Sequence, residues 1–387
     1  MSRIDLNYWL TCLVFIIGSI VYSLSLSIKI ISFQTLFVFI IFGTSLSFTR
    51  YILIRYYLRD KDSYSSTKVN SLPNLNKPIF ILLIFSVVYF ILFITLNSNT
   101  TNLTEIPREI ALRRYTQELK MPFYLKILRL TLTAGSILAS IQLAQKLSFL
   151  AILSIFLVFF DGLMSSGKAG PLQGVLYCFF TYLGTSVFYL NKQFKISLFK
   201  ILKIGVFFIL FLFVTQLGRL KDFNIDTYVF VVNRLFNYAF GGVNAFDYWF
   251  NNSYSFFNYT LNFGTQTFGG LFELLGIQDR VQGIYQEGIR FGDQPPTNIF
   301  TGFRHLLLDY NLLGLIGFGS LISLIGLVTE YKIKSGNVGY LFIYPVLQTY
   351  LSWIFFSSMF SYNTYIISII LAYIIFKWNC KIRKYNY

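Results

Sequence analysis

The chain has 387 residues, of which 55% are hydrophobic and only 12% are charged, and its formal net charge is +16 at pH 7. Soluble proteins are typically about a quarter charged, and a water-soluble fold of this length could not hide so much apolar surface. The composition excludes a cytosolic globular enzyme, a disordered chain and, with three cysteines, a secreted disulfide scaffold, so most of the protein is expected to lie in lipid.

Apolar runs long enough, or nearly long enough, to cross a bilayer core recur along the chain. They occupy residues 8–28, 30–48, 79–96, 127–144, 148–163, 171–190, 204–218, 307–329, 339–358 and 363–378. These runs predict an all-α, polytopic integral membrane helix bundle with about ten transmembrane helices. The first run is predicted to be a retained helix, because no small-residue cleavage pattern follows it, and only Lys29 separates it from the second.

Basic residues are concentrated in every second connector between the predicted spans, and these connectors lie on the same side of the membrane. Segment 50–78 carries six of them, and further clusters lie in 191–203, at Lys332 and Lys334, and at the end of the chain. Short cytoplasmic connectors are enriched in lysine and arginine, so both termini and segment 50–78 are predicted to be cytoplasmic. This bias accounts for nearly all of the net charge, which therefore indicates anchoring to anionic lipid headgroups and no nucleic-acid partner.

Two long connectors are predicted to lie on the outer side. Segment 97–126 mixes acidic and basic residues and is predicted to form an interfacial helix. Segment 219–298 is longer than a connector requires and too aromatic for disorder, so we expect short amphipathic helices broken at Gly241–Gly242 and Gly269–Gly270. The chain thus divides into three predicted parts: helices 1–7 with the cytoplasmic basic loop 50–78 (1–218), the large periplasmic loop (219–298), and helices 8–10 (299–387).

The segment that opens the eighth span has the densest polar chemistry in the chain. Pro295 and Pro296 end any preceding helix, so Thr297 or Asn298 is the predicted N-cap of the next one. Polar residues at spacings of three, four and four then share one helical face: Asn298, Thr301, His305 and Asp309. Because polar groups at membrane depth are costly, this stripe is a candidate functional site.

The candidate catalytic residues are His305, Asp309 and Arg304. Asp309 lies one turn after His305 and can orient its imidazole as a general base. Arg304 lies near a helix N-terminus, where backbone N–H groups and the helix dipole attract phosphate. The alternative is that His305 and Asp309 pair with each other, or with a neighbouring helix, as packing contacts.

Further basic residues are predicted on the same outer side. The candidate substrate contacts are Arg219, Arg234, Arg290 and Lys168, with Tyr238 on the helical face of Arg234. Guanidinium groups bind phosphate in a bidentate manner, so arginines that converge with Arg304 would form a cradle for a diphosphate. Each arginine alone is equally well explained as an interfacial anchor, and Lys168 lies in SSGKAG, which lacks the spacing of a phosphate-binding P-loop.

Acidic candidates for a base or a glycan contact in the large loop are Asp247, Glu287 and Asp293. Asn244, Asp247 and Asn251 share one helical face beside Trp249, and amide, carboxylate and aromatic groups together are typical of sites that grip sugars. The alternative is an interfacial aromatic belt. A single histidine and three cysteines, two of them within apolar runs, argue against a metal site.

Three segments stand out together with the layout of the spans: SSGKAGPLQG after the fifth span, NRLFNYAFGGVNAFDY in the large loop and TGFRHLLLDYNLLGLIGFGSLISLIG at the eighth span. In combination they resemble the bacterial oligosaccharide repeat-unit polymerases of the O-antigen polymerase family. The resemblance implies a membrane glycosyltransferase (GT-C-like) fold in the bacterial inner (cytoplasmic) membrane, with an active site that faces the periplasm. It maps the functional arginine and histidine of the family onto Arg304 and His305, with Gly314 following, and places Lys168 where the family often has an arginine.

The resemblance further implies an enzyme of lipopolysaccharide and polysaccharide biosynthesis that needs no cofactor, nucleotide sugar or metal. Such an enzyme transfers the growing glycan from undecaprenyl diphosphate to the non-reducing end of a new lipid-linked repeat unit. The expected partners are the undecaprenyl-diphosphate-linked oligosaccharide, membrane lipids and a chain-length regulator protein. In this hypothesis Arg304 and Arg290 hold the diphosphate, and His305, oriented by Asp309, activates the acceptor hydroxyl. The alternatives are an O-antigen ligase of the same fold and, in another class, a flippase or transporter of lipid-linked oligosaccharide.

Overall fold

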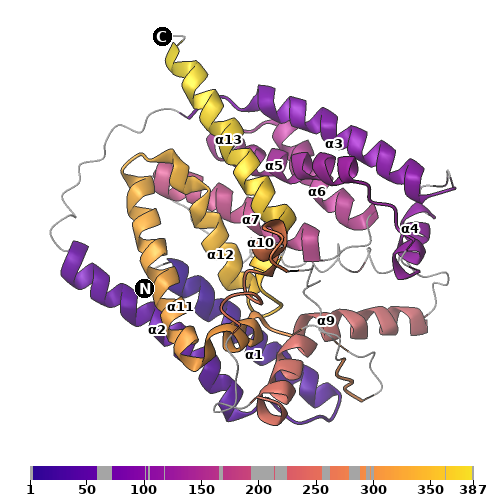
Figure 1. The fold of residues 1–387 in the computed structure, drawn as a ribbon, viewed down its shortest axis with the longest axis vertical. Coiled ribbons are helices and arrows are strands. Elements are labelled where there is room, and N and C mark those ends of the chain that lie inside the picture. Colours follow the sequence, from indigo (N-terminus) through magenta and orange to yellow (C-terminus); the bar gives the residue numbers. More distant parts are fainter. Residues whose placement is uncertain are drawn as a thin grey trace. The chain divides into compact units, whose positions relative to one another are not determined.

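The computed structural model consists of helices (Figure 1). It describes residues 3–58, 72–100, 102, 105–116, 118–164, 169–192, 213, 225–254, 262–278, 288–292, 297, 300–361 and 363–385. Within these ranges the extended pairing is limited to an isolated antiparallel bridge between Ile289 and Thr297. The predicted all-α class is therefore confirmed.

Six helices in the described residues are long and apolar enough to cross a membrane. They are α1 (Arg3–Ser25), α2 (Phe33–Leu53), α3 (Asn76–Asn97), α5 (Phe123–Gln145), α11 (Gly302–Lys334) and α13 (Asn363–Tyr385). The other α-helices are α4 (Ile106–Tyr115), α6 (Phe149–Met164), α7 (Ala169–Gly184), α9 (Ile225–Asn252), α10 (Gly269–Leu274) and α12 (Ile343–Trp353). Single π or 3₁₀ turns lie at Ile54–Leu58, Thr185–Tyr189, Val338–Leu341 and Met359–Ser361.

Helices cover all of the predicted apolar runs except the seventh, 204–218, of which only Phe213 is described. The apolar side chains also behave as expected for a membrane protein. On α3, Tyr89 and Phe93 are buried, whereas Phe80 and Ile91 are exposed. A helix that is apolar all round and packed on one side is stable where its other side faces lipid. The membrane helix bundle is thus confirmed in its coarse form, and the count of about ten spans stays a prediction.

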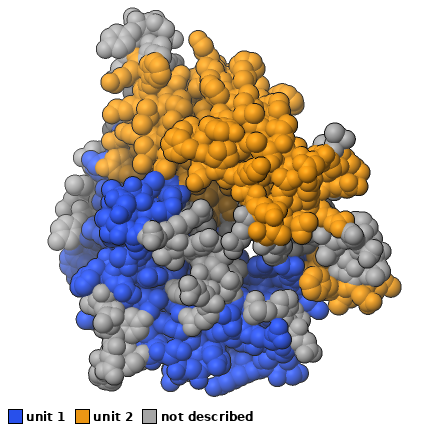
Figure 2. Space-filling model, turned by 45° about the vertical axis from the view of Figure 1, so that its right-hand side comes forward, with its two compact units in different colours: residues 1–67, 233–335, 346–363 blue, residues 68–232, 336–345, 364–387 orange. Residues whose placement is uncertain are grey.

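The chain forms two compact units that interleave along the sequence (Figure 2). Unit 1 comprises Met1–Thr67, Asn233–Ser335 and Val346–Asn363, and unit 2 comprises Lys68–Val232, Gly336–Pro345 and Thr364–Tyr387. Each unit combines three separate segments of the chain, because helices far apart in sequence pack together.

In unit 1, α2 and α11 pack against each other and run in the same direction. Phe39 contacts Phe303 near the start of both helices, with ring centroids 4.8 Å apart. Near the far ends, the buried Arg50 forms an ion pair with Glu330. Parallel spans are what the charge-based topology predicts for the second and the eighth run, since both enter the membrane from the outer side.

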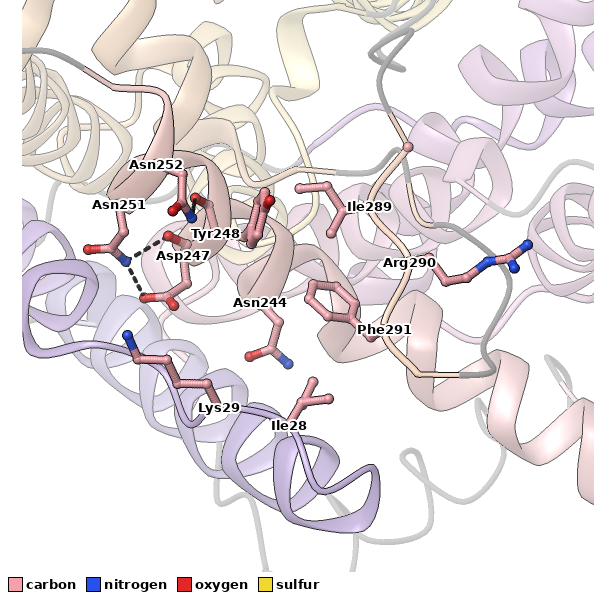
Figure 3. A pocket seen from close by; sticks show the side chains of 11 residues that line it. Ile28, Lys29, Asn244, Asp247, Tyr248, Asn251, Asn252, Ile289, Arg290 and Phe291 are labelled. Carbon is pink, nitrogen blue, oxygen red and sulfur yellow. Dashed lines mark hydrogen bonds between the residues drawn. The ribbon is translucent and has the colours of Figure 1, made fainter.

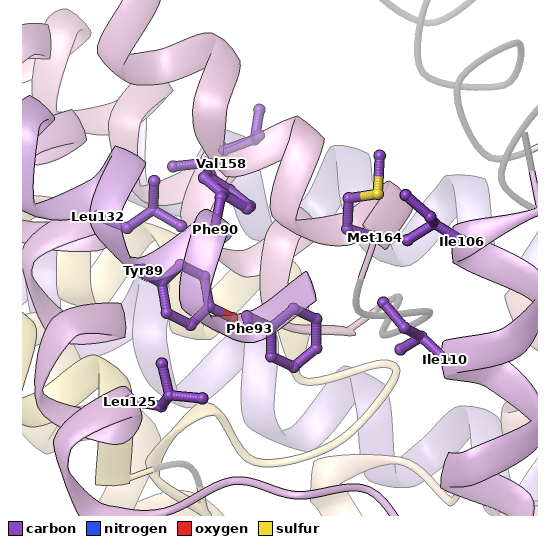
Figure 4. Close-up of a cluster of buried hydrophobic side chains, with 10 residues drawn as sticks. Tyr89, Phe90, Phe93, Ile106, Ile110, Leu125, Leu132, Val158 and Met164 are labelled. Carbon is purple, nitrogen blue, oxygen red and sulfur yellow. The ribbon is translucent and has the colours of Figure 1, made fainter. Parts of the chain in front are cut away.

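In unit 2, α5 packs against α3, α6 and α7. Small buried residues of α5, among them Gly135 and Ala139, let the neighbouring helices approach closely. Figure 4 shows the adjoining apolar cluster, in which Tyr89, Leu125 and Ile110 come from α3, α5 and α4. A helix is therefore present inside segment 97–126, as predicted.

The predicted helix break at Gly241–Gly242 is wrong, because α9 runs without interruption from Ile225 to Asn252. A β-carbon at Gly241 would lie 2.2 Å from Asn237 Oδ1, which accepts a hydrogen bond from Tyr22 Oη of α1 at 2.9 Å. Glycine at this position leaves room for the Asn237 side chain, which is hydrogen-bonded to α1, and the helix continues through it. Gly269 and Gly270 open α10.

The predicted start of the eighth span is also wrong. Thr297 pairs with Ile289 through two backbone hydrogen bonds of 2.8 Å, and α11 begins at Gly302 with Thr301 at its N-cap. The helix is broken again at Asn311, whose φ of 62° and ψ of −168° are not helical. The first turns, from Thr301 to Asp309, are buried on every side and form a separate short segment.

Candidate functional site

An open cavity of about 460 Å³ lies in unit 1, where the connector after α1 meets the end of α9 and segment 288–291 (Figure 3). We call it the polar pocket and define it by its polar lining: Lys29, Asn244, Asp247, Asn251 and Arg290. The rings of Tyr248 and Phe291 also line it. Carboxylate, amide, cationic and aromatic groups therefore meet in one cavity.

The end of α9 supplies most of the pocket. Asn244, Asp247 and Asn251 follow one another at spacings of three and four residues and line the same cavity. Their predicted common face is confirmed. Trp249 is buried and Tyr248 is exposed.

The carboxylate of Asp247 joins α9 to the start of α2. Its Oδ1 accepts hydrogen bonds from Ser32 N (2.8 Å), Ser32 Oγ (2.5 Å) and Asn251 Nδ2 (3.1 Å). Ser32 is the N-cap of α2, and its Oγ accepts a bond from Thr35 N. Within the described part of the chain, all hydrogen bonds to this carboxylate reach Oδ1, so Oδ2 remains able to accept a hydrogen bond from a ligand.

The side-chain amide of Asn244 also has one atom that is hydrogen-bonded and one that is not. The residue is 4% exposed, and its Oδ1 accepts a hydrogen bond from Ser23 Oγ at 3.2 Å. Its Nδ2 is buried and makes no hydrogen bond to the residues that the structure describes. A buried donor without a partner costs about 1–3 kcal/mol. Asn244 lines the polar pocket, and a ligand oxygen that reached this donor would remove that cost.

The cation that faces this row is Lys29. Ser27, with φ of 53°, turns the chain after α1, and Ile28 N then donates to Ser23 O at 3.0 Å. Figure 3 shows the Lys29 side chain extending toward Asp247, whereas the guanidinium of Arg290 points away from it. Sequence reasoning used Lys29 only as a marker of the turn. Its position on the predicted outer side, against the positive-inside trend, was the signal that could have found it.

Arg304, His305 and Asp309 lie in the buried first turns of α11 and do not line the polar pocket. Arg304 is 5% exposed, and its guanidinium lies 4.7 Å from the ring centroid of Trp249 and 4.1 Å from that of Phe300. These cation–π contacts hold the side chain against aromatic faces. The predicted diphosphate contact of Arg304 would require this packing to open.

Asp309 binds the loop that precedes α10. Its Oδ1 accepts a hydrogen bond from Gln266 N (3.1 Å) and its Oδ2 from Thr267 N (2.6 Å), while Ser358 Oγ donates to Thr267 O (2.6 Å). These bonds give Asp309 a structural role in fixing loop 262–268. The general-base pair of His305 and Asp309 stays a prediction.

The expected convergence of the arginines on one cavity is not what the described residues show. Arg234 lies over the ring of Tyr238, 5.9 Å from its centroid, which confirms their common face, but neither residue lines the polar pocket. Of the described arginine candidates, Arg234 and Arg304 lie against aromatic rings, and Arg290 lines the polar pocket. Four further candidates lie outside the described residues: Arg219, Lys168, Glu287 and Asp293.

Sequence reasoning missed a partly buried charge pair in unit 2. Arg129 of α5 and Asp161 of α6 form an ion pair of 2.6 Å, and Tyr89 Oη donates to Asp161 Oδ1 at 2.8 Å. The sequence signal that could have found the pair is a single charged residue inside each of two apolar runs, Arg129 in 127–144 and Asp161 in 148–163. One oxygen of Asp161 on α6 accepts a hydrogen bond from Tyr89 of α3, and the other pairs with Arg129 of α5. This cluster therefore joins the three helices.

Comparisons of the chain with protein-family models, with curated proteins and with solved structures find no match. The resemblance to O-antigen polymerases therefore rests on the sequence segments, and function is inferred from the chemistry of the polar pocket. Among the described residues, no group of three or more His, Cys, Asp or Glu is placed to hold a metal ion.

Proposed function

We propose that the protein is a membrane glycosyltransferase that polymerises lipid-linked oligosaccharide repeat units. It would transfer the growing glycan from undecaprenyl diphosphate to the non-reducing end of a new lipid-linked unit, at the periplasmic face of the bacterial inner membrane. The observation that carries the proposal is that Asn244, Asp247 and Lys29 line one cavity, while Asn244 Nδ2 and Asp247 Oδ2 make no hydrogen bond to the described residues.

These groups suit a glycan better than an apolar ligand. A sugar hydroxyl can donate to Asp247 Oδ2 while accepting from Asn244 Nδ2, and this uses both capacities of one O–H group. The rings of Tyr248 and Phe291 offer apolar surface for the faces of sugar rings. The ammonium of Lys29 favours the negative charge of a phosphate beside the glycan.

The same groups can support the transfer step. The acceptor hydroxyl oxygen forms a new bond to the anomeric carbon of the donor, and the bond from that carbon to the diphosphate oxygen breaks. The electron pair leaves with the diphosphate, whose developing charge Lys29 can stabilise. The hydroxyl proton passes to a base, for which Asp247 in the pocket and the buried His305 are the two candidates.

The test uses the lipid-linked repeat unit that accumulates when the gene is deleted in its host. Purified protein in lipid nanodiscs is expected to convert this substrate into a ladder of longer glycans on a gel. Asp247→Asn removes the negative charge and should lower the rate by about a hundredfold, the usual scale for a general base or an electrostatic contact. Asp226→Asn is the matched control, because Asp226 is an exposed carboxylate at the other end of α9.

Three outcomes would contradict the proposal. The first is a full ladder at the wild-type rate from Asp247→Asn. The second is a single glycan transferred to a different lipid, which would indicate a ligase. The third is movement of the lipid-linked unit across liposome membranes without elongation, which would indicate a flippase.

A further inference from the structure

A second cavity, of about 380 Å³, adjoins the polar pocket in unit 1 and has the opposite character. Its walls are formed mainly by apolar side chains of α2, of α9 with the residues directly after it, and of α11: Phe33, Phe37, Val38, Phe250, Tyr254 and Leu312. We call it the apolar groove. Asn251 lines both cavities, so the two are neighbours around one side chain.

The border between the cavities coincides with the start of a membrane span. Ser32, the N-cap of α2, donates to Asp247 of the polar pocket, and the next residue, Phe33, lines the apolar groove. The residues before a spanning helix lie at the level of the lipid headgroups, and its first turns enter the hydrocarbon. The polar pocket therefore lies where the polar head of an amphiphilic lipid would be, and the apolar groove lies where its hydrocarbon tail would begin.

The groove is open to the surroundings of the helices. Phe33 is 77% exposed and Phe37, one turn later, is 49% exposed, although both are large apolar side chains on a predicted span. Past the break at Asn311, Leu313 and Ile316 continue an exposed apolar surface along α11. A chain in the groove can thus extend into the lipid without crossing polar surface.

We propose that the apolar groove binds the first isoprene units of a polyprenyl diphosphate whose diphosphate lies in the polar pocket. The inference rests on the proposed function for the choice of lipid and adds the place of its chain. Lys29 supplies the cation for the diphosphate, and the walls of Phe33, Phe37 and Phe250 suit a stiff, methyl-branched chain. Asn251 lies where head and tail meet.

Native mass spectrometry of the purified full-length protein tests the groove without any transfer reaction. The wild-type protein is expected to bind undecaprenyl diphosphate at least about tenfold more tightly than isopentenyl diphosphate, because the single isoprene unit of the latter buries far fewer CH₂ groups in the groove. The double variant Phe33→Ala/Phe37→Ala should reduce this preference to about twofold or less. The matched double variant Ile40→Ala/Phe48→Ala changes two exposed residues of α2 that do not line the groove, and should keep the full preference.

A photo-crosslinking experiment on the wild-type protein is independent of how well the variants fold. An undecaprenyl diphosphate analogue with a diazirine on its first isoprene unit should label peptides that contain residues 33–38 or 250–254. Label elsewhere, an unchanged chain-length preference in Phe33→Ala/Phe37→Ala, or equal competition by phosphatidylglycerol would overturn the inference. If the lipid binds as expected while no glycan is elongated, the proposed function fails and the lipid site stands.

Discussion

In two polar residues of the pocket, one side-chain atom makes hydrogen bonds that hold neighbouring segments together, and the other atom makes none to the described residues. Asn244 Oδ1 accepts a hydrogen bond from Ser23 and Asp247 Oδ1 accepts one from Ser32, while Nδ2 of Asn244 and Oδ2 of Asp247 make no hydrogen bond to the described residues. The sequence predicted that Asn244 and Asp247 share a helical face. It could not predict this division, because Ser23 and Ser32 lie more than two hundred positions away.

The separate roles of Asn244 Oδ1 and Nδ2 can be tested with two variants that lose the hydrogen bond between Ser23 and Asn244. Ser23→Ala should lower the free energy of unfolding by about 1 kcal/mol, the net value of one hydrogen bond, and Asn244→Ala should lower it by less, because it also removes the buried donor that has no partner among the described residues. Only Asn244→Ala also removes the donor in the pocket, so it alone should weaken binding of the lipid-linked repeat unit, by about fivefold. Thermal shift and native mass spectrometry measure the two effects, and equal binding by both variants would show that Nδ2 does not meet the ligand.

Glu109 provides a pH-dependent contact outside the membrane spans. The hydrogen bond from Ser98 Oγ (2.7 Å), together with backbone N–H groups of Asn99 and Thr100 and the Arg113 guanidinium, holds the pKa of this carboxyl below its ordinary value of 4.5. A lowered folded-state pKa adds stability above the unfolded-state pKa, and this stability is lost as the pH falls through the folded-state value.

The wild-type protein should therefore melt at a higher temperature than Glu109→Gln at neutral pH, and the difference should shrink as the pH falls below 4.5. Differential scanning fluorimetry in detergent across this range measures it. Glu118→Gln is the control, because Glu118 is an exposed residue of the same connector. A gap between wild type and Glu109→Gln that widens in acid would contradict the assignment.

At the scale of elements, the positions of the helices were predictable and their interruptions were not. Apolar runs locate α2, α3 and α5 because lipid requires long apolar segments. Glycines and prolines were poor guides to the breaks. Gly241 packs inside a continuous helix, whereas α11 is broken at Asn311, a residue type that sequence patterns do not mark as a break.

The break at Asn311 is held by side-chain hydrogen bonds. Its Oδ1 accepts bonds from Leu312 N (2.7 Å) and Tyr254 Oη (2.5 Å), which compensate a backbone conformation that only glycine adopts readily. Asn311→Ala keeps the strain that the wild type also has and loses both bonds, so it should destabilise the protein by about 1–3 kcal/mol. Asn311→Gly also loses the bonds but relieves the strain. Its free energy of unfolding should therefore lie between those of the wild type and Asn311→Ala. Chemical denaturation in detergent measures the order, and an alanine variant as stable as the glycine variant would contradict it.

At the scale of the whole molecule, the bundle is assembled from helices far apart in sequence. The polar pocket joins residue 29 to residues 244–252 and 288–291, and no local pattern reveals such a combination. Charge bias did predict that the basic ends of α2 and α11 share a side of the membrane, and the Arg50–Glu330 pair agrees with it. Among the described residues, Arg234 and Arg304 each lie against an aromatic ring and do not line the polar pocket, so the predicted convergence of the arginines stays a prediction.

The orientation of the pocket is open to a labelling test. In a variant without Cys12, Cys178 and Cys380, a cysteine at position 29 should react with a membrane-impermeant maleimide added to spheroplasts. A cysteine at position 332 should react only after the membrane is permeabilised, because α11 ends on the predicted cytoplasmic side. Both residues are exposed in the structure, so a reversed pattern of labelling would place the pocket in the cytoplasm.

The central claim is that the polar pocket holds the diphosphate and the adjacent sugar of a lipid-linked glycan. An electron cryomicroscopy structure of the protein in nanodiscs with its lipid-linked repeat unit tests this claim most directly. We expect the diphosphate within ion-pair distance of Lys29 and a sugar hydroxyl between Asn244 and Asp247. A diphosphate bound instead at Arg304 or Arg234, with no ligand density in the polar pocket, would contradict the account.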